Sequence, residues 1–204
     1  MRTATFKALT GDYKISDIIV KGAIGGGGDT AQKINADGTW GDLYYYFTYD
    51  GTYWLDDGWY KDEAGTPITD DDVIGVGEAF IVTAASDFTL TFAGEVVVGK
   101  PTVGVPAGSS IIGNPTPVSC KIGNIEVTGA IGGGGDTAQK INADGTWGDL
   151  YYYFTYEGTY WLDDGWYKDE AGTPVTDEDI LEPSESMIFT SAAGMELKFP
   201  SVID

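Results

Sequence analysis

The chain has 204 residues, 32 of them acidic and 11 basic, a formal charge of −21, no histidine and a single cysteine, Cys120. This charge disfavours nucleic acid and anionic membranes as partners, because a polyanion is repelled and releases no counterions. Without histidine or a second cysteine, the usual general base, the catalytic triads, most zinc and copper sites and any intrachain disulfide are excluded.

The beginning of the chain, residues 1–7, lacks the apolar stretch of about 7–15 residues that a signal peptide carries. No run approaches the ~18 apolar residues of a membrane helix, so we expect no membrane insertion. Two locations stay open, the cytoplasm and, for a chain whose leader is missing, the extracellular space or cell surface. The many Gly, Thr, Tyr and Asp residues and the few Lys favour the second.

Short strands are predicted throughout, because β-branched and aromatic residues form brief runs bounded by Gly, Asp or Pro. No window carries the i, i+3, i+4, i+7 apolar spacing of a helix over three turns. In the first half of the chain, the predicted strands cover residues 3–8, 17–20, 43–49, 52–55, 78–83 and 88–92.

The glycine-rich run at residues 25–30 is predicted to be a flexible or sharply turning loop. It resembles a phosphate-binding loop only in its glycines, because no Gly-Lys-Ser/Thr follows and Asp29 would repel phosphate.

The clearest predicted hairpin joins 43–49 to 52–55 through a two-residue Asp50-Gly51 loop. Because side chains alternate along a strand, this loop places two sets of residues on opposite faces. One face then carries Leu43, Tyr45, Phe47 and Trp54, and the other carries Tyr44, Tyr46, Tyr53 and Leu55. The first face is the more apolar and is assigned to the core, which leaves a tyrosine-rich outer surface.

A second hairpin is predicted between residues 78–83 and 88–92, across the loop at 84–87.

Two acidic clusters, at residues 35–42 and 56–63, are candidate calcium sites, because Asp and Asn on tight glycine turns supply oxygen ligands. Neither cluster has EF-hand spacing, and solvated acidic turns are the alternative. The candidate ligands are Asn35, Asp37, Asp42, Asp56, Asp57 and Asp62, with Asn142, Asp144, Asp149, Asp163, Asp164 and Asp169 in the second copy.

Exposed aromatic residues are the candidates for an interface or a ligand site. Tyrosine combines a large contact area with little rotamer entropy, and tryptophan beside acids can stack on a sugar ring. The candidates are Tyr44, Tyr46, Tyr53, Trp40 and Trp59, with Tyr151, Tyr153, Tyr160, Trp147 and Trp166 in the second copy. Packing within the sheet and core is the alternative for these side chains.

A repeat of 107 residues organises the chain. Residues 22–67 recur as 129–174 with one difference, Asp50 against Glu157, while the flanks have diverged but keep their apolar pattern. Either recent gene conversion or a shared surface explains this conserved centre. We expect an all-β fold of two tandem antiparallel β-sandwich (jelly-roll or Ig-like) domains, 1–98 and 99–204. Cys120 aligns with Tyr13, is predicted to be buried in a strand, and is assigned no chemistry.

The ends of the two repeats do not match. Met1 aligns with Gly108, so the first domain is expected to lack an edge strand that residues 100–107 supply to the second, unless residues 94–103 serve both. An unpaired edge is a template for the strand of another chain.

One further pattern is Gly58-Trp59, then residues 77–82 and 90–96, with residues 111–115 (Ile-Ile-Gly-Asn-Pro). It resembles repeat modules in secreted and surface proteins of bacteria that have no assigned activity. The resemblance covers most of each half and implies a surface or extracellular β-module, and no functional residue carries over from it.

We therefore expect a non-enzymatic structural or surface protein that assembles with copies of itself, head-to-tail, into a filament or layer. Strand edges and the tyrosine faces would make the contacts, with Ca²⁺ as a candidate stabiliser. The alternative is a tandem carbohydrate-binding module with a glycan as partner. An enzyme is disfavoured, because two near-identical blocks argue against one deep active site and chance pairs among 32 acids are certain.

Overall fold

The computed structural model describes residues 2–5, 13–23, 28–35, 39–49, 55–75, 78–91, 98–132, 135–142, 146–156, 162–183 and 185–202. These residues are mostly strands, and every ladder among them is antiparallel. The helical elements of this part of the chain are two 3₁₀ turns, η1 (Ile15–Asp17) and η2 (Ile122–Asn124). The all-β prediction is confirmed.

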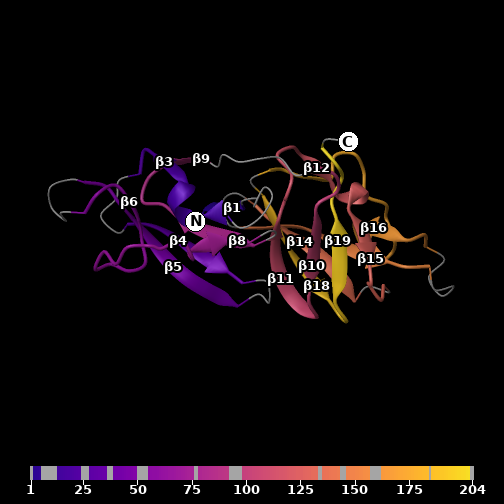
Figure 1. Ribbon diagram of the computed structural model, residues 1–204. Coiled ribbons are helices and arrows are strands. Elements are labelled where there is room, and N and C mark those ends of the chain that lie inside the picture. The colour runs from indigo at the N-terminus through magenta and orange to yellow at the C-terminus, as the bar shows by residue number, and fades with distance from the viewer. Residues whose placement is uncertain are drawn as a thin grey trace.

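Each half contains a five-stranded main sheet. In residues 1–98, the first half, the order is β1 (Arg2–Thr5), β8 (Ala79–Thr83), β4 (Asp29–Ile34), β5 (Trp40–Phe47) and β6 (Gly58–Tyr60). In residues 99–204, the second half, it is β11 (Gly108–Gly113), β18 (Ser186–Ser191), β14 (Asp136–Ile141), β15 (Trp147–Phe154) and β16 (Gly165–Tyr167). Within the described residues, each sheet takes its strands from one half, as the separation of colours in Figure 1 shows.

Smaller ladders accompany each main sheet. The short pairs are β2 (Tyr13–Lys14) with β7 (Val73–Ile74), and β12 (Cys120–Lys121) with β17 (Ile180–Leu181). The longer ladders are β3 (Ile19–Lys21) with β9 (Thr89–Thr91) in the first half, and β10 (Thr102–Val105), β19 (Met195–Lys198) and β13 (Glu126–Thr128) in the second. The longer ladder thus has two described strands in the first half and three in the second.

The central strands, β4 and β14, are elements that the sequence analysis did not predict. β4 pairs with β5 on one side and β8 on the other. Its inward residues are Asp29, Ala31 and Ile34, all buried. The sequence of β4 contains no run of β-branched or aromatic residues that would predict a strand. Its pairing with β5 and β8 holds it in the centre of the sheet.

The predicted hairpin at 43–55 is wrong in its register. β5 pairs with β6, which sets Tyr46 opposite Trp59 and Phe47 opposite Gly58. The predicted loop and most of the predicted second strand fall on residues 50–54, which lie outside the described residues. The connection between the paired strands is therefore far longer than two residues, and a local turn rule did not determine which strand β5 meets.

The second predicted hairpin is also wrong. β8 pairs with β1 and β4, whereas β9 pairs with β3 in a different ladder. The loop at 84–87 thus carries the chain from one sheet to another.

Most of the buried apolar side chains of the described residues belong to one cluster in each half. Between the halves, β1 lies near β18 and β11 lies near β8. The outer strand of each main sheet therefore lies near a strand of the other main sheet.

Candidate functional site

The predicted outward face of β5 points into the core. Tyr44 and Tyr151 are each only 2 % exposed, and Tyr46 and Tyr153 are also buried. The tyrosine-rich outer surface is therefore a wrong prediction. These rings can be buried because the hydroxyls of Tyr44 and Tyr151 donate to Asp72 Oδ1 at 3.3 Å and Asp179 Oδ1 at 3.1 Å.

The face assigned to the core is mixed. Phe47 is buried, but Leu43 and Tyr45 are partly exposed. Phe47 packs edge-on against Tyr60, with ring centroids 5.4 Å apart. This contact covers the second face of the sheet at that end of the strand.

Trp59 and Trp166, predicted to contact a partner or ligand, are buried as well. Each makes an edge-on ring contact of 5.1 Å, Trp59 with Tyr46 and Trp166 with Tyr153. Their surroundings differ at the indole nitrogen. Trp166 Nε1 donates to Ile125 O at 3.1 Å, whereas Trp59 Nε1 is buried with no partner among the described residues.

Trp40 and Trp147 remain as exposed candidates, at 60 % and 63 %. By strand alternation, Trp40 shares a face of β5 with Asp42 and Tyr44, but it lies beyond the covered part of the strand. Tyr53 and Tyr160 lie outside the described residues.

Several predicted calcium ligands instead stabilise turns. Asp57 Oδ1 accepts a hydrogen bond from Tyr49 N at 2.6 Å, and Asp62 accepts bonds from the amide and hydroxyl of Thr66. Asn35 donates to Thr39 Oγ1 at 3.0 Å. The second copy repeats these bonds at Asp164, Asp169 and Asn142.

The remaining predicted ligands are not gathered into one site. Asp42, Asp56, Asp149 and Asp163 are exposed, and Asp37 and Asp144 lie outside the described residues. Within the described part of the chain, no three Asp, Glu, Cys or His side chains lie close enough to hold a metal ion.

A buried polar cluster around Asp72 and its equivalent Asp179 was missed by the sequence analysis. Each carboxylate forms a 2.9 Å ion pair with a lysine, Lys61 or Lys168, and accepts a 2.6 Å bond from the amide of Thr69 or Thr176. Burial by itself raises the pKa of Asp179, but the Lys168 and Thr176 bonds outweigh it and lower this pKa to about 2. In the sequence, the Thr-x-x-Asp spacing of Thr69 and Asp72, repeated at Thr176 and Asp179, is the signal from which this cluster could have been predicted.

A shallow cavity opens beside each cluster. It measures 260 Å³ in the first half, where Asp42, Tyr44, Lys61 and Asp62 contribute to its wall, and 300 Å³ in the second. Two carboxylates and one lysine contribute to the wall of each cavity.

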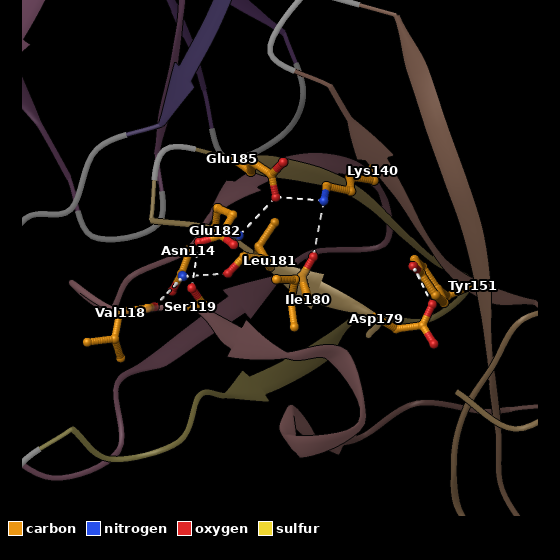
Figure 2. Close-up of polar contacts among 10 residues, drawn as sticks. All are labelled: Asn114, Val118, Ser119, Lys140, Tyr151, Asp179, Ile180, Leu181, Glu182 and Glu185. Atoms are coloured by element: carbon orange, nitrogen blue, oxygen red, sulfur yellow. Dashed lines mark hydrogen bonds and ion pairs between the residues drawn. The ribbon is translucent and has the colours of Figure 1, made fainter. Parts of the chain in front are cut away.

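A second network fixes the turn that precedes β18 in the second half (Figure 2). Lys140 Nζ lies 2.7 Å from Glu185 Oε2 and donates to Ile180 O at 3.1 Å. Asn114 Nδ2 donates to the carbonyls of Val118 and Leu181. These bonds join β14 to β17, so this network is structural.

Cys120 lies in β12 and is buried, as predicted. Burial raises the pKa of its thiol to about 12, so little thiolate forms at neutral pH.

The longer ladders end differently in the two halves. In the second half, β19 pairs with β13 on one side and β10 on the other. Its counterpart in the first half, β9, pairs with β3 alone within the described residues. The expected difference in edge strands is therefore present in the described part of the chain.

Comparison with known proteins finds no family model, no curated protein and no solved structure that matches this chain. Among the described residues, none of the helices has the length and apolar character needed to cross a bilayer.

Proposed function

We propose that this chain is a non-enzymatic structural protein of the cell surface or extracellular space that self-assembles head-to-tail through strand edges. Its two halves would be tandem β-sandwich domains, 1–98 and 99–204. The tyrosine faces have no part in this proposal, because their rings are buried. The side of β9 that has no paired strand among the described residues is the observation that carries it.

An open strand edge presents amide and carbonyl groups in the spacing that another strand needs. β9 offers this edge in the first half, and the exposed side chains of the strand, Thr89 and Thr91, carry no charge that would repel a partner. A contact from the first half of one copy to a different surface of the next is heterologous. Such contacts build rings or open filaments.

The test compares the wild type with two variants of equal charge change. Thr89→Lys/Thr91→Lys places two lysines on the open strand, where they blunt strand pairing. Glu196→Lys changes the charge by the same amount at the position of β19 that is equivalent to Thr89, on a strand whose neighbours are both present.

Light scattering and electron microscopy should show regular assemblies for the wild type and Glu196→Lys, and single chains for the double variant. A wild type that stays monomeric at high concentration, with calcium present, would contradict the proposal. Equal loss of assembly in both variants would assign the effect to charge and also contradict it.

A tandem carbohydrate-binding module is the second candidate, supported by the exposed rings of Trp40 and Trp147 beside Asp42 and Asp149. A glycan array should then show binding that Trp40→Ala/Trp147→Ala reduces at least about tenfold, since stacking on an aromatic ring is lost. Tyr49→Ala/Tyr156→Ala removes equally exposed rings and is the control. Unchanged binding by the tryptophan variant would contradict this candidate.

A further inference from the structure

We propose that the open side of β9 accepts a donated strand with the side-chain pattern of β10, that is, an extended segment with valine-sized groups at alternate positions. This acceptor role rests on the proposed function, in which strand edges join chains, and it adds the chemistry of the strand that β9 takes.

The second half shows how such a strand is held. In β10, Val103 lies opposite Leu197 and Val105 opposite Met195. Both valines are buried, at 5 % and 2 % exposure, and belong to the core cluster of that half. The pairing continues beyond the strand, where Phe199 N donates to Pro101 O at 2.9 Å.

Among its described residues, the first half carries the receiving surface without the strand. The repeat offset places Leu90 at the position of Leu197 and Phe88 at that of Met195. Both pack against the first core cluster but are only partly buried, whereas Leu197 is fully covered. Apolar surface that Val103 and Val105 cover in one half is thus accessible in the other. A donated strand would place its two valines opposite Leu90 and Phe88.

A hollow of about 460 Å³ lies beside this ladder in the first half, where Ile18, Val20 and Trp59 contribute to its wall. Trp59 Nε1 is buried without a partner among the described residues, whereas the equivalent Trp166 Nε1 bonds to Ile125 O, the counterpart of Ile18 O. The second half, whose longer ladder has three described strands, is therefore the half in which the tryptophan, Trp166, is hydrogen-bonded to the residue that precedes β13.

These two differences have a common cause if the third strand completes the packing of the ladder. A strand on β9 would bury Leu90 and Phe88 and favour a closer approach of β3 to β6. Trp59 Nε1 would then reach Ile18 O, as Trp166 reaches Ile125 O. The indole of Trp59 reports this change, because its nitrogen gains a hydrogen bond.

The probe is a labelled synthetic peptide of residues 100–107, Lys-Pro-Thr-Val-Gly-Val-Pro-Ala. It is titrated by fluorescence polarisation into the full chain, at a concentration where light scattering shows single chains. We expect one peptide per chain, because the equivalent edge of β19 already holds β10. A control peptide with Val103→Ser and Val105→Ser has the same charge and should bind at least tenfold more weakly.

Tryptophan emission gives the second readout. Saturating peptide should shift the emission of the wild type, and Trp59→Phe should bind the peptide with most of that shift lost. Binding without any change in wild-type emission would overturn the link to Trp59. Equal affinity for the serine peptide, or two peptides per chain, would overturn the acceptor role.

The two proposals fail separately. If the wild type assembles at higher concentration but single chains do not bind the peptide, the acceptor role is overturned and assembly through edges stands. If the peptide binds but the wild type never assembles, the acceptor role is supported and the proposed function is overturned.

Discussion

At the scale of single residues, the hydroxyl partners decide the burial of the tyrosines. Tyr44 and Tyr151 fill the core with a ring and end on a buried carboxylate, Asp72 or Asp179, so no polar atom is stranded. A ranking by hydrophobicity places tyrosine outside and leucine inside. The structure has the reverse order on β5, because the partner of the hydroxyl comes from a residue 28 positions away.

Asp179 should make stability depend on acid. Its pKa is lowered to about 2 in the fold, below the ordinary 3.8, so its contribution is complete above pH 4 and is lost as pH falls toward 2. Asp179→Asn should cost about 2 kcal/mol in the free energy of unfolding at pH 7, measured in urea, and much less near pH 2.

Asp177→Asn is the control for this acid dependence. Asp177 pairs with Lys121 but its side chain is 85 % exposed, so its loss should change stability little at either pH. A cost for Asp179→Asn that is equal at both pH values would contradict the role of its charge.

At the scale of elements, the neighbours of a strand matter more than its composition. β4 and β14 are central strands although their residues give a weak strand signal. β9 and β19 occupy equivalent positions in the repeat, but β9 has one described neighbour and β19 has two. β10 accounts for this last difference. Val103 and Val105 alternate along β10 with the exposed residues Thr102 and Gly104. The face of this short strand that carries the valines therefore closes the core of the second half.

Val105→Ala should therefore destabilise the second half by about 2 kcal/mol, because it removes buried methyl groups and leaves a cavity beside Met195. Thr102→Ala, on the exposed side of the same strand, should change the free energy by less than about 0.5 kcal/mol. Urea denaturation of both variants measures the difference. Equal effects would show that β10 contributes through its backbone alone.

At the scale of the whole molecule, the charge of −21 is carried largely by exposed carboxylates on turns and opposes the compact state. Sodium chloride raised from about 0.02 M to 0.5 M should increase the Tm by a few °C, because it screens this repulsion. If the predicted calcium ligands do bind the ion, millimolar calcium should add a further increase in Tm that EDTA reverses. Calorimetry at matched ionic strength separates the two, and a Tm equal to that in sodium chloride would contradict a calcium site.

The sequence by itself determined the strand-rich class, the repeat and the chemistry that the chain lacks, since these follow from composition, local propensity and identity between segments. Burial of Cys120 also followed from the sequence, whereas the pattern that predicted exposed tryptophans held at Trp40 and failed at Trp59. The tertiary structure alone decided which face of β5 is inward, which strand β5 meets, and that β9 has one paired neighbour among the described residues. Alternation defines two faces of a strand but not their environment, and pairing over long distances along the chain depends on the packing of all the strands together.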